Sequence, residues 1–275
     1  MSGPERWQRT DPVRGIDALA HEGFSRGAAA YERARPAYPR EAVAWICERL
    51  GVAGGGSVLD LGAGTGKLAR LVREVTGADV VAVEPVAEMR EIAAAHGVPV
   101  VDGTAEDLGV GDETVDAVVC GEAFHWFDGS RALEEMSRVL RPGGGVGLVW
   151  NVHAWDREAA WVQAIQQLLA PHSDGRADTR YSSGQWRAAF ELDARWSSLE
   201  QRVFRHELQL DAAALVDHVD SVSFVAALPD AERAELLGEV GRIARGLAGP
   251  VAIPYRTDAY VTRLTADRRE PRDRR

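Results

Sequence analysis

The chain has 275 residues, of which 45% are apolar and 27% are charged, with a formal net charge of −10 and a pI near 5.3. That size and composition allow one large α/β domain, alone or with an added cap. The acidic balance argues against a nucleic-acid partner, which needs clustered Lys and Arg for its phosphates.

We expect no membrane segment, because no apolar run is long enough to span a bilayer. The first ten residues carry no apolar signal region. The two cysteines, Cys47 and Cys120, form no CxxC pair and no disulfide framework, which favours a reducing cytoplasm. The seven His residues are scattered without metal-ligand spacing, so we expect no metal site.

The N-terminal part of the chain changes character at about residue 23. Residues 1–22 are polar and mixed, and we expect a flexible arm there. Residues 24–50 read as one or two helices, interrupted at Pro36 and Pro39.

A glycine-rich turn follows a short apolar segment and is the most informative part of the sequence. Residues 57–61 read as a strand, and the glycines come at the spacing Gly62-x-Gly64-x-Gly66. This is not the G-x-G-x-x-G of dinucleotide sites, and Asp60 stands two residues before the first glycine. A carboxylate there would repel a pyrophosphate and attract a cation. S-adenosylmethionine, with its sulfonium and ammonium groups, fits this turn; the alternative is a plain βαβ turn.

A second acidic residue ends the next predicted strand, residues 80–84. Glu84 comes 22 residues after Gly62. A carboxylate at the end of the second strand is well placed to accept two hydrogen bonds from a ribose diol. Asp60 and Glu84 together therefore favour the cofactor interpretation over the plain turn.

Strand-like and helical segments then alternate, which favours a parallel sheet. The further strands are expected at residues 99–101, 115–120 and 146–150. The clearest helix is 130–140, in which Ser130 could be the cap and Leu133, Met136 and Leu140 share one face.

An aromatic run lies at the expected end of the fourth strand, where parallel sheets place their ligands. It reads Phe124-His125-Trp126-Phe127. Aromatic side chains suit a pocket wall that excludes water. His125 has an ordinary pKa near neutrality, so it can act as a base, hold a substrate, or simply pack.

The second half of the chain has a different pattern. Helices are expected at residues 156–170, 211–222 and 230–247, strands at 199–210 and 255–264, and a polar loop at 171–184. Residues 266–275 are a charged segment in which acids offset the arginines, and we expect a disordered tail.

Residues 24–151 resemble class I S-adenosylmethionine-dependent methyltransferases with a methyltransferase type 11 domain. The matching segments are residues 31–39, the 60–66 turn, 83–85 with Met89, 103–106, 123–128, 138–144 and 150–151. On the His-Trp-Phe run and Trp150-Asn151, the chain is more narrowly similar to the trans-aconitate methyltransferase-like small-molecule group.

The resemblance implies an α/β fold: a Rossmann-like, seven-stranded, mostly parallel sheet with an antiparallel edge pair and an inserted helical cap. The methyltransferase domain would span 23–265. Its expected parts are N-terminal helices over the cofactor (23–50), a cofactor-binding core (56–151), a substrate cap (152–200) and a C-terminal sheet edge with helices (201–265).

The predicted cofactor site combines the turn with residues that the resemblance implies. Asp60, Gly62, Ala63 and Gly64 would lie along the methionine part and Glu84 at the ribose. The resemblance adds Tyr31, Arg35, Pro85, Met89, Thr104, Ala105, Glu106 and Ala123. Arg35 can clamp a carboxylate, of the cofactor or of the substrate, or be a surface Arg beside a proline turn.

Phe124, His125, Trp126 and Asn151 are the predicted substrate pocket. The predicted reaction is methyl transfer from S-adenosylmethionine to a small molecule by in-line displacement, possible acceptors being a carboxylate or a secondary metabolite. A carboxylate is already ionised, so His125 would then position it. The alternatives are a non-enzymatic S-adenosylmethionine-binding regulator and a nicotinamide-dependent reductase, against which the glycine spacing and Asp60 argue.

Overall fold

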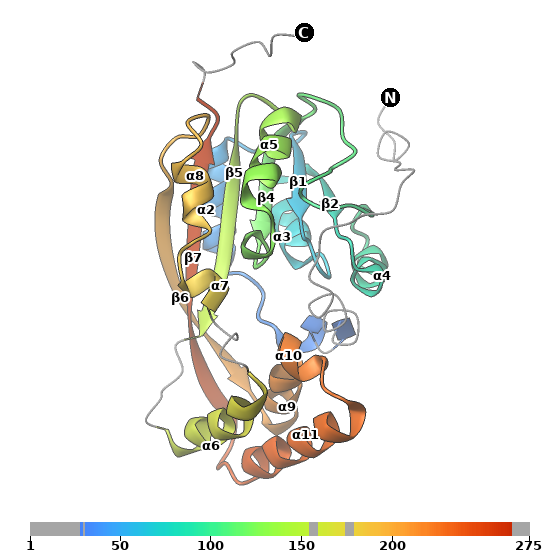
Figure 1. Ribbon diagram of the computed structural model, residues 1–275, viewed down its shortest axis with the longest axis vertical. Coiled ribbons are helices and arrows are strands. Elements are labelled where there is room, and N and C mark those ends of the chain that lie inside the picture. Colours follow the sequence, from blue (N-terminus) through green and yellow to red (C-terminus); the bar gives the residue numbers. More distant parts are fainter. Residues whose placement is uncertain (1–27, 30, 154–158, 174–178, 266–275) are drawn as a thin grey trace.

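The computed structural model describes residues 28–29, 31–153, 159–173 and 179–265, which contain a seven-stranded sheet in the order β3-β2-β1-β4-β5-β7-β6 (Figure 1). The strands are β1 Ser57–Leu61, β2 Asp79–Val83, β3 Val100–Val101, β4 Val115–Gly121, β5 Leu140–His153, β6 Glu200–Leu210 and β7 Val251–Arg263. β1 to β5 pair in parallel, whereas β7 is antiparallel to both β5 and β6. The predicted Rossmann-like fold class with an antiparallel edge pair is confirmed.

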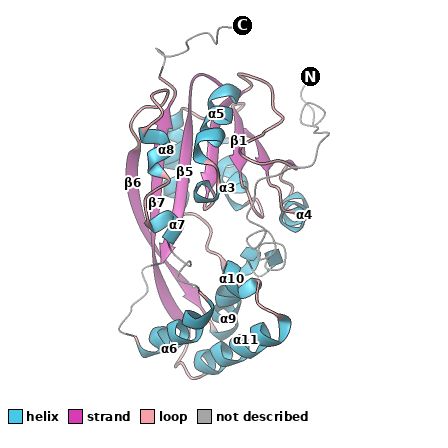
Figure 2. Cartoon of the chain, viewed as in Figure 1, coloured by secondary structure: helices cyan, strands magenta, loops and turns pink. Residues whose placement is uncertain are grey.

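Helices cover both faces of this sheet, because its central strands are apolar on both sides (Figure 2). On one face, α2 (Arg40–Leu50) and α3 (Lys67–Thr76) pack on side chains such as Val58. On the other, α5 (Gly129–Val139) and α8 (Arg187–Glu191) pack on Leu59 and Leu61. Successive side chains of β1 point alternately into the two cores, so β1 is almost entirely buried. Helix α4 (Ala87–Ala95) lies beside β3.

Strands β5 and β7 are longer than the sequence predicts. β5 was expected only at residues 146–150, but β7 pairs with it from Gly145 to His153. Its parallel pairing with β4 ends at Gly121, opposite Val149. The four residues that follow in β5, with β7 beside them, therefore extend past the carboxyl end of β4 and form a wall there.

A separate group of helices lies at that end of the sheet (Figure 1). It consists of α6 (Ala160–Leu169), α9 (Ala212–Asp220), α10 (Ser223–Ala226) and α11 (Asp230–Arg245). These helices share an apolar cluster with Ile253 and Tyr255 of β7. The predicted cap range 152–200 supplies α6, the short α7 (Thr179–Ser182) and α8, while α9 to α11 come from the chain between β6 and β7. Helix α7 falls inside the predicted polar loop.

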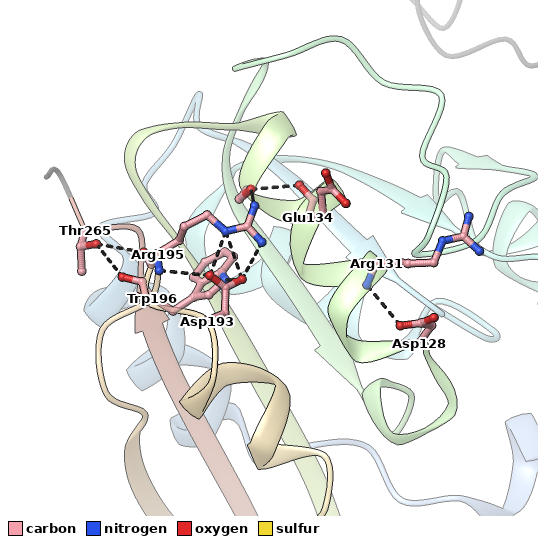
Figure 3. Close-up of polar contacts among 9 residues, drawn as sticks. Asp128, Arg131, Glu134, Asp193, Arg195, Trp196 and Thr265 are labelled. Carbon is pink, nitrogen blue, oxygen red and sulfur yellow. Dashed lines mark hydrogen bonds and ion pairs between the residues drawn. The ribbon is translucent and has the colours of Figure 1, made fainter. Parts of the chain in front are cut away.

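The N-cap of α5 is Asp128 and not Ser130, as Figure 3 shows. The Asp128 carboxylate accepts a hydrogen bond from the Arg131 amide at 3.2 Å. Its negative charge at the helix N-terminus adds a favourable dipole interaction that a serine lacks. The same view shows Arg195, which binds Asp193 and the Ser137 hydroxyl and so ties the segment after α8 to α5.

No helix in the described part of the chain is long and apolar enough to cross a membrane. The described residues contain no group of three or more His, Cys, Asp or Glu side chains that could hold a metal ion. The predicted arm 1–22 and tail 266–275 lie outside the described residues.

Candidate active site

The glycine turn lies at the carboxyl end of β1 and has the backbone that only glycine adopts easily. Gly62, Gly64 and Gly66 have φ values of 63°, 57° and 79°. A Cβ on Gly62 would lie 2.6 Å from that of Ala123, whereas a Cβ on Gly64 would meet nothing within 4 Å. Gly62 is thus required by packing against the end of β4, and Gly64 leaves an open face for a ligand.

Glu84 holds this turn in place from the end of β2. Its carboxylate accepts the Gly64 amide at 2.8 Å and the Val86 amide at 2.9 Å. Burial raises the pKa of Glu84, and these two backbone hydrogen bonds partly offset the rise. Each carboxylate oxygen has a second lone pair, so Glu84 can still accept bonds from a ligand.

Asp60 is fully buried below the same turn, and it lines the cavity described below. Neither of its carboxylate oxygens accepts a hydrogen bond of normal geometry from the described residues. Burial raises its pKa to about 8, with a small opposing effect of the Ala69 amide and a further rise from Glu84. A buried carboxyl without a partner costs about 1–3 kcal/mol of stability, and a bound cation would offset that cost.

One cavity of about 1300 Å³ begins at this turn and continues past the ends of β4 and β5. Of the predicted site residues, those that line it are Tyr31, Arg35, Asp60, Gly62, Ala63, Gly64, His125, Trp126 and Asn151. The volume exceeds the ~300–1,000 Å³ that is usual for one small ligand. The cavity therefore has room for a cofactor and a second molecule.

The segment around residues 31–38 covers one side of the cavity. Lys67 of α3 donates to the carbonyl oxygens of Glu32 and Arg35 at 2.6 and 2.7 Å. Burial lowers the pKa of Lys67, but these carbonyls and the Glu32 carboxylate surround its ammonium group. The predicted covering segment is thus tied directly to the helix that follows the glycine turn.

Arg35 points into the cavity beneath α9. Its Nη2 donates to the Ser221 carbonyl at 3.4 Å, while its buried Nε has no hydrogen-bond partner among the described residues. Burial, and then the positive charge of Arg35, lower the pKa of His218 to about 4. Arg35 therefore has donor capacity left for an anion.

Glu122 follows β4 and has an unusual backbone, with φ of 57°. Its carboxylate accepts the Asn151 amide at 2.5 Å, and its side chain lines the cavity. The left-handed region is costly for a residue with a Cβ and often marks a functional position. The predicted residue Asn151 has its side-chain oxygen bound by the Thr257 hydroxyl at 2.6 Å.

His125 is fixed by Trp150. The indole N–H of Trp150 donates to Nδ1 of His125 at 3.0 Å. Because the indole N–H can only donate, Nδ1 must accept, and the proton of the neutral imidazole is on Nε2. His125 thus presents an N–H donor on its other nitrogen.

Beyond His125, aromatic rings form one wall of the cavity. Trp150 stacks on Tyr181 with ring centroids 4.7 Å apart and lies 4.6 Å from Trp186. Tyr260 of β7 packs edge-on against both tryptophans. Arg187 of α8 lies over the rings of Trp186 and Tyr260.

The other predicted site residues do not line this cavity. Met89 is buried against Ala28 and Val86, and Ala105 and Phe124 belong to the core on the α5 face. Thr104 is buried and forms an isolated β-bridge with Asp107. The Glu106 carboxylate accepts a hydrogen bond from the Asp128 amide at 2.9 Å, and Ala123 packs on Gly62. Pro85, like Glu84, lies at the end of β2 outside the cavity. Phe124 contributes to a smaller cavity on the α8 side.

Sequence reasoning missed Glu122, Arg187 and Tyr260. An acid at the end of the fourth strand was a signal that could have identified Glu122. Arg187 and Tyr260 carry no motif, because Tyr260 reaches the site through the pairing of β7 with β5 and Arg187 through the packing of α8 on the sheet.

Comparison with known proteins shows the family. The chain is 36% identical over 242 residues to an uncharacterized methyltransferase of Mycobacterium tuberculosis, covering 85% of this chain and 92% of the relative. The chain belongs to the class I S-adenosylmethionine-dependent methyltransferases. The methyltransferase-domain family model matches residues 59–148, which include the glycine turn and His125.

Two further matches are a curated relative and a solved structure. An uncharacterized methyltransferase of Schizosaccharomyces pombe is 30% identical over 223 residues, covering 80% of this chain and 86% of that protein. A solved structure from Anaeromyxobacter dehalogenans, itself assigned by inference as a type II methyltransferase, superposes with a TM-score of 0.60. It is 24% identical and covers 82% of this methyltransferase and 97% of its own chain, so it supports the fold alone. The trans-aconitate-like subgroup stays a prediction.

Proposed function

We propose that this methyltransferase transfers the methyl group of S-adenosylmethionine to a small-molecule acceptor held in the same cavity. The observation that carries the proposal is the buried, unpartnered Asp60 below an open glycine turn. A cationic ligand without phosphate satisfies that carboxyl group, and Gly64 leaves room for it. The cavity volume supports a second, small ligand beside it.

The residues present fit the cofactor. Asp60 would face its positive charges, and Gly62 to Gly64 would lie along its methionine part. Glu84, which is next to the cavity through its bond to the Gly64 amide, would accept its ribose hydroxyls. Tyr31 and Arg35 would cover it, with Arg35 taking the carboxylate through its unused donors. When bound, S-adenosylmethionine supplies an electrophilic methyl carbon, so the protein needs little covalent chemistry of its own.

The chain's contribution is then position and exclusion of water. Orientation of two bound reactants can supply up to ~7–11 kcal/mol of the barrier. The segment tied down by Lys67 covers one side, and the rings of Trp126 and Trp150 border the other.

His125 acts in this proposal as a hydrogen-bond donor that orients the acceptor. To serve as a base through Nε2 it would need its proton on Nδ1, which would place two N–H donors face to face with Trp150. The sequence left two roles open for His125, that of a base and that of a positioning residue, and this hydrogen bond favours positioning.

The test is a calorimetric titration of the whole protein with S-adenosylhomocysteine and with NADH. We expect heat from the first and none from the second; the reverse result would point to a reductase. Incubation with radiolabelled S-adenosylmethionine and several small-molecule extracts should then label a small molecule. Binding of S-adenosylhomocysteine without labelling in any extract would instead support a non-enzymatic binding protein.

A further inference from the structure

The cavity has a second polar region on the side away from the glycine turn, around Arg187. Arg187 lines the cavity together with Trp150, Trp186, Tyr260 and Gln201. The Tyr260 hydroxyl accepts hydrogen bonds from Arg187 at 2.7 Å and from Gln201 at 2.9 Å. The mechanism above uses neither Arg187 nor Tyr260.

Arg187 retains most of its hydrogen-bonding capacity. A guanidinium has five N–H donors, and the only bond that Arg187 makes within the described residues is the one to Tyr260. No carboxylate in the described part of the chain forms an ion pair with it, whereas the neighbouring Arg256 is paired with Asp258. Its other nitrogen atoms are not among the buried ones that lack a partner, so they are accessible, and Arg187 lines the cavity.

Tyr260, which binds Arg187, lies on a strand away from the glycine turn. Asp60 pairs with Val119, Val119 with Gly147, and Gly147 with Val261, next to Tyr260. Three strand spacings of ~4.8 Å therefore separate the strand of Asp60 from that of Tyr260, roughly 14 Å in total. A cofactor bound at the turn leaves this region to the acceptor.

We propose that Arg187, supported by the Tyr260 hydroxyl, binds the anionic group of an elongated methyl acceptor that extends along the cavity toward His125. The class of acceptor is an elongated organic carboxylic acid. Its carboxylate is held at Arg187 as a recognition group, and the methylated atom is at the opposite end, near His125. The inference rests on the proposed function, because that function makes the ligand a methyl acceptor.

A structural role is the competing explanation, since the guanidinium lies 5.1 Å from the Trp186 ring centroid and 4.8 Å from that of Tyr260. Such contacts alone could hold α8 on the sheet. They would not, however, make the protein distinguish an acid from its amide. That distinction is the readout of the test.

The experiment uses the full chain, with and without saturating S-adenosylhomocysteine. Trans-cinnamate and indole-3-acetate are titrated by calorimetry, each beside its uncharged primary amide. We expect each acid to bind at least about tenfold more tightly than its amide, because the amide lacks the charge that pairs with Arg187. Arg187→Gln should remove this preference, and Arg187→Lys should retain part of it.

Arg202→Gln is the matched control. Arg202 also lies over an aromatic ring, that of Phe204 at 5.1 Å, but it is exposed and outside the cavity. This variant should keep the acid preference. Thermal unfolding of both glutamine variants checks that they fold.

The outcomes separate the two proposals. If neither acid binds, if acid and amide bind equally, or if Arg187→Gln keeps the preference, the inference is wrong. If S-adenosylhomocysteine does not bind but the acid preference depends on Arg187, the anion site stands and the proposed function fails.

Discussion

The ionisation of Asp60 should control binding of the cofactor. With a pKa of about 8 in the free protein, its carboxyl group is mostly protonated at neutral pH. A cationic ligand favours the charged form, so binding must release a proton below pH 8. We predict that the affinity for S-adenosylmethionine rises by up to about tenfold per pH unit from pH 6 to 8 and then levels off. Calorimetry at several pH values measures this, and a flat profile contradicts it.

Asp60→Asn is the partner experiment at the same residue. The folded pKa lies above the unfolded value of 3.8, so the folded state binds more protons between these values. Stability of the free protein should therefore fall as pH rises from about 4 to 8. The asparagine variant should lose this pH dependence and be more stable at pH 7 by about 1–3 kcal/mol. Unfolding in urea at pH 5 and 7 measures the change in stability. The variant should also bind the cofactor weakly, which calorimetric titration measures.

A second prediction concerns the proton on His125. Nitrogen-15 NMR of labelled histidine should find it on Nε2 near neutral pH, because Trp150 donates to Nδ1. Trp150→Phe removes that donor and should let both tautomers form. Once an acceptor is known, His125→Asn should lower kcat by a factor that does not change with pH. Recovery of the rate at high pH would show that His125 is a base.

Asp60, Gly62 and Gly64 could be predicted from the sequence because they form one continuous turn whose spacing reflects its backbone geometry. Arg187 and Tyr260 could not, since each is an ordinary residue until strand pairing brings Tyr260, and the packing of α8 on the sheet brings Arg187, to the cavity. The role of Trp150 was also hidden, because its partner His125 belongs to a different strand end.

At the scale of elements, Glu84 joins β2 to the glycine turn and to the start of α4. Glu84→Ala leaves the Gly64 and Val86 amides without their acceptor. We predict a loss of about 2 kcal/mol or more in unfolding free energy, together with weaker binding of S-adenosylhomocysteine. Glu91→Ala, which removes an exposed acid from α4, is the control and should change neither. An intact turn and unchanged affinity in Glu84→Ala would contradict this assignment.

Most elements were predictable because their periodicity is strong, and β1 matches its expected bounds. The length of β5 was not. Its first residues include Pro142 and three glycines, which are typical of a turn. They form a register shift, because β4 pairs with Leu140 and next with Gly145, and β7 pairs with β5 only from Gly145 on. The length of the strand is thus a tertiary effect that local sequence does not encode.

For the whole molecule, the sheet and the helices around α9 should differ in how strongly their backbone amides are protected from hydrogen exchange. From Tyr255 to Val261, β7 pairs with both β5 and β6, so the amides there open only when the sheet does. We predict that hydrogen exchange of Ala259 to Val261 is among the slowest in the protein, despite their place near the end of the chain. Helix α10, which has four residues, should exchange much faster. Equal rates, measured by mass spectrometry, would contradict this.

The position of β7 also has a consequence for biosynthesis. Within the described residues it is the last strand to leave the ribosome, yet it stands between two strands made earlier. β6 can join the sheet only after translation has passed residue 263, so a nascent chain must keep that strand unpaired and accessible to chaperones until then. A premature stop codon anywhere before residue 251 would remove the pairing partner of β6 and leave that strand with unpaired backbone groups that can pair with another chain.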